Sequence, residues 1–203
     1  MFTGIVTDIG EILSREAAGE VVRFSIGSRY EAAGIDLGAS IACDGVCLTV
    51  TAVEARGEGA VFSVDAGPET LRLTTAGGWD AGRRINLERA LKIGDELGGH
   101  LVLGHVDDLG EIVEREDGPD TVRFVFDAPA ELARFIAVKG SICLDGTSLT
   151  VNTVEDRRFS VHLIPHTLRE TAWGERRVGD RVNLEVDMMA RYAARLAEAS
   201  RLG

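Results

Sequence analysis

The chain has 203 residues, of which 45% are hydrophobic and only 5% aromatic, so Val, Ile, Leu and Ala must fill its core. The formal net charge of −11 argues against a nucleic-acid partner, because nucleic acid requires a basic surface. No run of about 18 apolar residues occurs, so we expect no membrane span. An odd number of cysteines favours reduced thiols. Together with an N-terminus that does not resemble a signal peptide, this predicts a cytoplasmic protein.

Strand patterns dominate the first half of the chain. Apolar and polar residues alternate over residues 22–26 and 84–88, and turn residues separate such runs. This pattern is typical of antiparallel strands. Residues 31–33 suggest a short helical turn before the segment 40–50. Within that segment Asp44-Gly45 lies between two apolar runs, which predicts a tight hairpin turn.

The second half repeats the first. Residues 141–151 (SICLDGTSLTV) match residues 40–50 (SIACDGVCLTV) at seven of eleven positions, and a second hairpin turn is predicted at Asp145-Gly146. Flanking matches keep the same order, with GEI at 10–12 and 110–112, FSV at 62–64 and 159–161, and NLE at 86–88 and 183–185. Solenoid repeats have periods of about 20 to 50 residues, whereas a period of about 100 is the size of a small domain. The sequence therefore predicts a duplicated domain with two similar pockets.

These elements predict an all-β fold of two similar six-stranded Greek-key antiparallel barrels related by internal duplication, followed by a C-terminal amphipathic α-helix. Closed barrels are favoured because closure removes exposed strand edges. Residues 129–136 add a short predicted helix that begins with Pro129. We place the N-terminal barrel at residues 1–97, the C-terminal barrel at 98–187 and the final helix at 188–203.

The final helix has no counterpart in the first half. Met189, Tyr192, Leu196 and Ala199 follow a 3-4-3 spacing and form a narrow apolar stripe. Such a stripe suits either docking on the body of the same chain or a helical contact between subunits. The sequence leaves both alternatives open.

Common catalytic and metal-binding motifs are missing from the sequence. It contains no GxGxxG that opens a helix, no GxxxxGK[ST], no HExxH and no GxSxG. Cys43 and Cys47 have CxxxC spacing, but zinc needs three or four ligands. The nearest histidines, His100 and His105, belong to another segment. We therefore expect no metal site.

Candidate functional residues are the positions at which the matched halves differ. These pairs are Cys47 and Ser148, Ile5 and His105, and Glu69 and His166. A repeated segment whose two copies carry different polar side chains suggests two pockets that bind similar molecules in different roles.

Residue type alone leaves several functions open at these and neighbouring positions. The threonines shared by both halves, Thr49/Thr150 and Thr70/Thr167, suit a polar uncharged heterocycle, although threonine is also a common strand residue. A free cysteine is most often a small buried residue. His100 and His105 suit either a ligand or the mouth of a barrel.

Five segments in order resemble the riboflavin synthase family. They are residues 1–6 (MFTGIV), 45–50 (GVCLTV), 98–106 (GGHLVLGHV), 146–151 (GTSLTV) and 164–168 (IPHTL). The resemblance covers essentially the whole chain.

The resemblance implies a defined reaction and assembly. Two molecules of 6,7-dimethyl-8-ribityllumazine bind, and a four-carbon unit passes from one to the other. The products are riboflavin and 5-amino-6-ribitylamino-2,4-pyrimidinedione. The family fold is a homotrimer, with each active site between the N-terminal barrel of one subunit and the C-terminal barrel of a neighbour, and it uses no metal or organic cofactor.

Two further points follow from the resemblance. It leaves open an association with lumazine synthase. The alternative function is a non-catalytic lumazine or flavin carrier, because such carriers share the duplicated fold. The intact motifs in both halves favour the enzyme.

The resemblance also implies site residues. The proposed catalytic residues are Cys47, Ser40, His105 and Asp187. The residues implied for the pocket of the N-terminal barrel are Gly4, Ile5, Val6, Val46, Cys47, Leu48, Thr49, Val64, Asp65, Ala66, Gly67, Pro68, Glu69, Thr70, Gly104, His105 and Val106. Those implied for the C-terminal barrel are Lys139, Ser148, Leu149, Thr150, Ile164, Pro165, His166, Thr167, Leu168 and Arg169.

Three positions depart from the family pattern. Leu103 stands where many members have Ser, and Val46 stands where some have a second Cys. Gly67 makes its loop poorer in side chains than in some relatives. The first two lie next to implied pocket positions, where they would tune affinity.

The expected chemistry needs no strong protein base. The C7 methyl group of the substrate is acidic because its carbanion delocalises into the pteridine ring. Holding two reactants in attack geometry contributes about 7–11 kcal/mol to lowering a barrier. We therefore hypothesise that positioning supplies most of the catalysis, and that Cys47, Ser40 and His105 assist nucleophilic addition and proton transfer.

Overall fold

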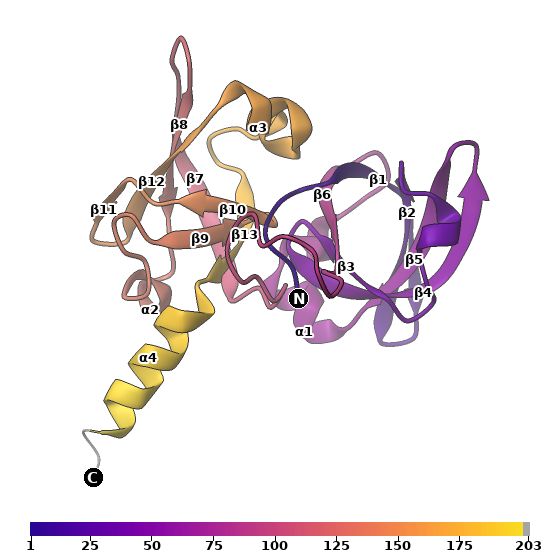
Figure 1. The fold of residues 1–203 in the computed structure, drawn as a ribbon, viewed down its shortest axis with the longest axis horizontal. Coiled ribbons are helices and arrows are strands. Elements are labelled where there is room, and N and C mark those ends of the chain that lie inside the picture. The colour runs from indigo at the N-terminus through magenta and orange to yellow at the C-terminus, as the bar shows by residue number, and fades with distance from the viewer. Residues whose placement is uncertain (201–203) are drawn as a thin grey trace.

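The computed structural model describes residues 1–200. It shows two β-rich halves side by side, with one helix projecting from the second half (Figure 1). The all-β, duplicated architecture predicted from the sequence is confirmed. Within the described residues, no helix is long and apolar enough to cross a membrane.

The first half is a closed barrel with the strand order β1-β2-β5-β4-β3-β6. Its elements are β1 (Asp8–Ala18), β2 (Val21–Ser28), η1 (Ala32–Gly34), β3 (Ser40–Cys43), β4 (Val46–Arg56), β5 (Gly59–Ala66), α1 (Pro68–Leu73), η2 (Thr75–Gly78) and β6 (Arg84–Arg89). Alternate residues of β5 point inward, as period-two patterning requires. Phe62 and Val64 are fully buried there, and Trp79 packs edge-on against Phe24, with ring centroids 5.3 Å apart.

The second half contains a curled sheet of seven strands in the order β10-β9-β13-β7-β8-β12-β11. Its elements are β7 (Asp108–Asp117), β8 (Val122–Asp127), α2 (Ala130–Ala133), β9 (Ser141–Leu144), β10 (Thr147–Thr150), β11 (Thr153–Glu155), β12 (Arg158–Leu163), α3 (Pro165–Glu170), η3 (Ala172–Glu175), β13 (Arg181–Val186) and α4 (Met188–Ala199). The predicted six-stranded count is therefore wrong for this half.

The extra strand arises from a bend that both halves share. In the first half β4 pairs with both β3 and β5, and its register shifts between Val50 and Ala52, as at a β-bulge. Val151 makes the same backbone hydrogen bonds to residues 139 and 140 as Val50 makes to residues 38 and 39, but Val50 is paired with β5, whereas pairing with β12 begins only at Thr153. The ladder is interrupted there, and one long strand becomes β10 and β11.

Both predicted hairpin turns are present and lie back to back between the halves. Asp44 and Gly45 have φ of 44° and 78°, and Asp145 and Gly146 have φ of 42° and 76°. Two consecutive residues with positive φ define the primed turn that suits a two-residue hairpin. A Cβ on Gly45 would lie 2.6 Å from the backbone nitrogen of Gly146, so the close approach of the two turns requires glycine.

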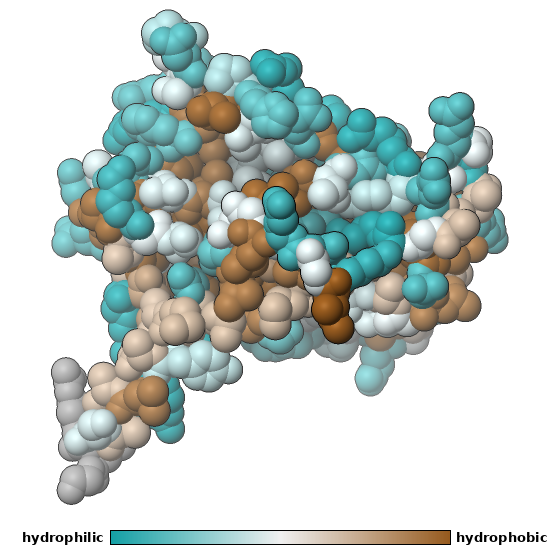
Figure 2. Space-filling view, viewed as in Figure 1, coloured by the Kyte–Doolittle hydropathy of each residue, from teal (hydrophilic) through white to brown (hydrophobic). Residues whose placement is uncertain are grey.

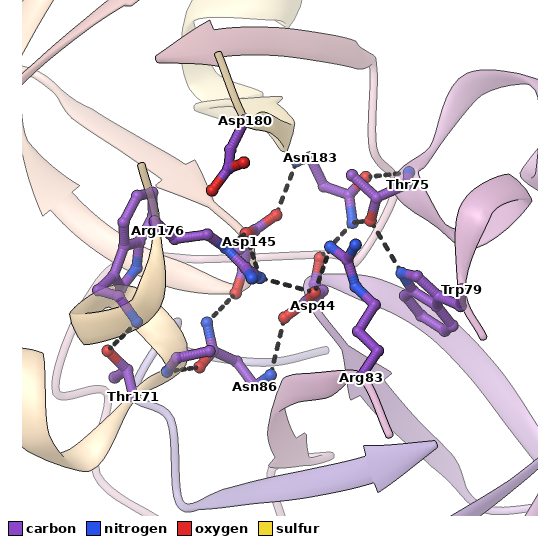
Figure 3. Close-up of polar contacts among 12 residues, drawn as sticks. Asp44, Thr75, Trp79, Arg83, Asn86, Asp145, Thr171, Arg176, Asp180 and Asn183 are labelled. Carbon is purple, nitrogen blue, oxygen red and sulfur yellow. Dashed lines mark hydrogen bonds and ion pairs between the residues drawn. The ribbon is translucent and has the colours of Figure 1, made fainter. Parts of the chain in front are cut away.

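A buried polar network joins the halves around these turns (Figure 3). Arg176 donates from Nη2 to Asp44 at 3.0 Å and from Nε to Asp145 at 2.9 Å. The side-chain amide of Asn86 donates to the carbonyl of Asp145 at 2.8 Å, and that of Asn183 donates to the carbonyl of Asp44 at 2.7 Å. Each half thus binds the turn of the other, which fixes their relative orientation.

One hydrogen bond in the second core gives a stability prediction. The Trp173 indole donates to Thr147 Oγ1 at 2.9 Å, and both residues are buried. Thr147→Val should lower the free energy of unfolding by about 1–3 kcal/mol, because the indole N–H loses its partner without access to water. Thr150→Val, on the same strand but exposed, should change it by less than about 0.5 kcal/mol. Urea denaturation followed by tryptophan fluorescence measures both, and equal costs would contradict the assignment.

The C-terminal helix forms as predicted up to Ala199, while residues 201–203 of the predicted segment lie outside the described residues. Asp187 caps the helix, since its carboxylate accepts from the Met189 N–H at 2.9 Å. The helix projects away from both halves (Figure 1).

Candidate functional site

The opening segment of each half reaches across to the other half. Phe2 pairs with Val102 in an isolated antiparallel bridge. Beyond that bridge, the Gly4 carbonyl accepts from the Ser148 N–H at 2.7 Å, and the Gly104 carbonyl accepts from the Cys47 N–H at 2.9 Å. Residues 1–6 therefore lie against β10 of the second half, and residues 101–106 lie against β4 of the first.

Glycine is required at both crossing points. Gly4 and Gly104 each have a φ of 75°, a conformation that other residues rarely adopt. A Cβ on Gly4 would lie 2.6 Å from Ser148 Cβ, and one on Gly104 would lie 2.6 Å from Cys47 Cβ. The glycines in the MFTGIV and LGHV segments thus permit the close approach of each segment to the opposite half.

This crossing corrects one predicted grouping. Gly4, Ile5 and Val6 were expected beside Cys47 in the first-half pocket, but the structure places Gly4 against Ser148. Gly104 and His105 were expected to reach the first-half pocket, and Gly104 does lie against Cys47. The first half therefore contributes its opening segment to the second-half site.

The first-half site contains polar groups from adjacent strands. Ser40 on β3 is the register partner of Thr49 on β4. Cys47 is half-buried, whereas Thr49 and His105 are exposed. Val106 packs against the first-half core. The structure therefore brings the thiol, the two hydroxyls and the segment 104–106 together at strands β3 and β4.

Several implied first-half residues offer no free side-chain group. Val46, Leu48, Val64 and Ala66 are buried in or against the barrel core, so only their backbones are available to a ligand. Asp65 forms a two-point ion pair with Arg23 at 2.7 and 2.8 Å, and Glu69 forms one with Arg72 at 3.1 and 2.7 Å. Hydrogen bonds from these arginines lower the pKa of both carboxyls.

The loop before α1 contains the next implied residues. Gly67 is the N-cap, Pro68 occupies the first turn, and Thr70 is partly buried. Proline suits the first helical turn, where its missing N–H has no helical partner to lose. Pro68 and Glu69 are exposed.

Among the three cysteines, Cys47 is the accessible one. Cys43 and Cys143 are fully buried, and burial raises the pKa of both thiols well above the usual range. A thiol reacts as its thiolate, so these two are inert. Within residues 1–200, no group of three or more His, Cys, Asp or Glu side chains is arranged to hold a metal ion.

The second-half site contains a histidine that the implied set missed. His100 Nδ1 lies 2.7 Å from Ser148 Oγ. Burial lowers the pKa of His100, an effect opposed by the charge of Asp187, and thus favours the neutral imidazole. The Gly98-Gly99 pair before it was the available sequence signal, because a pair of glycines permits a close backbone approach. A Cβ on Gly99 would lie 2.2 Å from the Thr3 carbonyl oxygen and 2.8 Å from Ser148 Cβ.

The remaining implied residues of the second half lie before and after Ser148 in the sequence. Leu149 points into the core and Thr150 outward. Lys139 has a φ of 65° and donates its N–H to the Val151 carbonyl at 2.8 Å. The segment from Ile164 into α3 has three exposed residues, Ile164, Pro165 and His166, then Thr167 and Leu168, which are partly buried, and Arg169, which is exposed. Asp187 lies where β13 passes into α4 and serves as the N-cap of that helix.

A cavity of about 710 Å³ lies between the halves, and none of the implied site residues is in its lining. Five arginines line it: Arg72, Arg83, Arg84, Arg176 and Arg181. Carboxylates pair with four of them, namely Glu69 with Arg72, Asp44 with Arg83 and Arg176, Asp145 with Arg176, and Glu175 with Arg84. With Asp180 also in the lining, the charges balance, and the cavity is part of the contact between the halves.

Comparisons with known proteins agree with the duplication. The family model for the lumazine binding domain matches residues 3–90 and again residues 103–187. The chain is 59% identical to riboflavin synthase of Brucella abortus over 199 residues, which cover 98% of each chain. It is 45% identical to riboflavin synthase of Mycobacterium tuberculosis over 203 residues, covering 98% of this chain and all of that one.

Relatives of lower sequence identity also match more than nine-tenths of the chain. Riboflavin synthase of Bacillus subtilis is 37% identical over 195 residues, covering 96% of this chain and 89% of that one. The crystal structure of LumP with riboflavin superposes with a TM-score of 0.82 at 21% identity, covering 92% of this chain and 99% of that one. At that identity the likeness shows a shared fold.

Proposed function

The chain belongs to the riboflavin synthase family of duplicated lumazine-binding domains, and from that premise we propose that it catalyses the dismutation of 6,7-dimethyl-8-ribityllumazine. A four-carbon unit passes from one lumazine to a second. Riboflavin and 5-amino-6-ribitylamino-2,4-pyrimidinedione are the products. No metal or organic cofactor takes part in the proposed reaction.

One observation carries the proposal that both halves bind the same kind of molecule. In each half an equivalent strand contacts a glycine from the opening segment of the other half. The polar side chain beside that contact differs between the halves. Cys47 and the segment of His105 meet in the first half, whereas Ser148 and His100 meet in the second. Matched frames with different polar groups suit two identical molecules that react in different roles.

The proposed roles follow from these positions. Cys47, Ser40 and His105 assist addition and proton transfer at the first-half site, while Asp187 lies near the second-half site. The other implied residues bind the ring and the ribityl chain through backbone groups and hydroxyls. We keep the domain boundaries at 97/98 and 187/188, which place His100 with the half whose Ser148 it contacts.

The C-terminal helix supports a proposed homotrimer. Met189, Tyr192 and Leu196 are 65%, 57% and 69% exposed, and Figure 2 shows apolar atoms along the projecting helix. Arg191 holds the other face of the helix to the body through an ion pair with Asp107 at 2.7 Å. The exposed stripe is therefore free to contact another subunit, which argues against the alternative that it docks on its own chain.

In the proposed trimer each active site lies between the first half of one subunit and the second half of another. Ile5 and Ile164 are 46% and 53% exposed, so apolar groups of the second-half site face outward within one chain. A neighbouring subunit would cover them. The family leaves open an association with lumazine synthase, and the odd number of cysteines supports a cytoplasmic location.

Replacing both Tyr192 and Leu196 by glutamate should convert the trimer into monomers and abolish turnover, because each substitution places a charge in an apolar contact. The fold should survive, since both side chains are exposed. Ala197→Glu is the matched control, because Ala197 is exposed on the same helix but outside the stripe. Light scattering coupled to size-exclusion chromatography measures the mass. A double variant that remains trimeric would contradict this role of the helix.

The reaction itself has a direct test. Purified protein incubated with the lumazine should produce one riboflavin for every two lumazines consumed, followed by absorbance and confirmed by chromatography. A stable complex with lumazine and no riboflavin would instead identify a carrier.

A further inference from the structure

We propose that Glu88 and Glu185 are matched positioning residues, each of which holds the opening segment of its own half so that it reaches the site of the other half. The inference rests on the proposed function for its catalytic consequence. Its geometric part stands on the hydrogen bonds alone.

The Glu185 side chain on β13 holds the segment that leads to His105. Its Oε1 accepts from the Leu103 N–H at 2.8 Å, and its Oε2 accepts from the Gly104 N–H at 2.9 Å. Gly104 in turn contacts Cys47 and precedes His105. Both carboxylate oxygens are thus used to fix two consecutive peptide groups beside the first-half site, an arrangement that we call the clamp.

Glu88 on β6 makes the equivalent clamp one repeat earlier. Its Oε1 accepts from the Thr3 N–H at 2.7 Å and from Thr3 Oγ1 at 2.8 Å, and its Oε2 accepts from the Gly4 N–H at 2.9 Å. Gly4 contacts Ser148 and precedes Ile5. The same clamp therefore delivers an apolar side chain to one site and a histidine to the other.

The two carboxylates are buried at an energetic cost. Glu88 and Glu185 are 5% and 3% exposed, and within the described residues neither forms an ion pair. Burial raises the pKa of both, and the backbone N–H groups oppose that rise. A buried charge without an ion pair destabilises a fold unless hydrogen bonds compensate. A role that requires two acceptor oxygens at once, as in the clamp, explains why a glutamate occupies both matched positions.

Glutamine is the informative replacement. It keeps the shape of glutamate but has one acceptor oxygen and an NH₂ group that can only donate. In either variant one backbone N–H would therefore face another donor, and the clamped segment would shift. Glu185→Gln and Glu88→Gln make the same chemical change at equivalent positions, so each serves as the structural control for the other.

The kinetic effects should differ because the two segments differ. Glu185→Gln displaces the segment of His105 from Cys47 and should lower kcat by about 10- to 100-fold, since misplacement by about 1 Å costs up to that much. Glu88→Gln displaces Ile5, a binding contact, and should raise KM by about threefold while kcat changes by less than about twofold. Equal effects on kcat from both variants would overturn the assignment.

A second readout does not depend on turnover. Cys47 packs against Gly104, so Glu185→Gln should accelerate its alkylation by iodoacetamide by about threefold or more, because access limits thiol reactivity. Glu88→Gln should leave that rate unchanged. Peptide mass spectrometry reports all three thiols at once, and fully buried Cys43 and Cys143 must stay unmodified if the fold is intact. An unchanged Cys47 rate in Glu185→Gln would refute the clamp, and an inactive wild-type protein would refute only the proposed function.

Discussion

Arg176→Met is expected to lower the free energy of unfolding by about 3–5 kcal/mol at pH 7, because it removes the cation shared by two buried carboxylates. Asp44 and Asp145 are both fully buried, and Arg176 contacts them at 3.0 and 2.8 Å. The other cation near Asp44 is Arg83, at 3.6 Å and 30% exposed. Urea denaturation at a fixed protein concentration measures the change.

The loss should become smaller as the pH falls. Burial and the charge of Asp145 raise the pKa of Asp44 to about 7, although Arg176 and Arg83 oppose the rise. Removing Arg176 raises it further. A carboxyl with a higher pKa in the folded than in the unfolded state contributes stability that is full below its unfolded pKa and is lost as the pH rises through its folded pKa. The folded Asp44 carboxyl of the variant binds a proton at a higher pH than that of the wild type, so the loss in Arg176→Met should shrink mainly as the pH falls from about 9 to 7.

Arg84→Met provides the control for this prediction. Arg84 pairs with Glu175, and both side chains are about half exposed. Its replacement should cost at most about 1 kcal/mol, with little change between about pH 9 and pH 7. If the two arginine variants were equally destabilised, or if the Arg176→Met loss did not vary with pH, the network would not stabilise the contact between the halves.

His105→Gln should lower kcat by about 100-fold, the lower end of what a positioned acid–base group contributes. The affinity for lumazine should change by less than about threefold, because an interaction used in the transition state changes kcat rather than ground-state binding. Cys47→Ser should act in the same direction. Stopped-flow absorbance gives kcat, and equilibrium fluorescence titration gives the affinity.

His162→Gln controls for the loss of a histidine as such. His162 is exposed on β12 and lies outside the proposed sites, so its replacement should leave kcat within about twofold of the wild type. If Cys47→Ser and His105→Gln both kept wild-type turnover and affinity, the catalytic assignment of these residues would be wrong.

Local patterns predicted much of this fold from the sequence. The repeat indicated the duplication, the two Asp-Gly pairs indicated the hairpin turns, and the 3-4-3 spacing indicated the C-terminal helix. The turns and the helix depend on residues close together in the chain, and the repeat is visible by comparing the two halves of the sequence. The break between β10 and β11 was missed because the alternating pattern does not reveal where pairing with β12 begins.

Contacts between distant segments could not be read in this way. The crossing of residues 1–6 and 101–106 depends on glycines whose partners, Cys47 and Ser148, lie in the opposite half. Glu88 and Glu185 occur in matched strands and look like ordinary solvated positions of an alternating pattern. His100 has no counterpart in the first half, so comparing the repeats gave it no signal.

The contact between the halves has the form of an isologous dimer interface held within one chain. Asn86 and Asn183 exchange bonds with opposite turns, so each contact occurs twice with the partners reversed. Two separate copies of one repeat would have to carry the same residue on both sides. Covalent fusion removes that constraint, and Arg176 accordingly stands where the aligned first half has Trp79. The same freedom from symmetry allows a thiol in one pocket and a hydroxyl in the other.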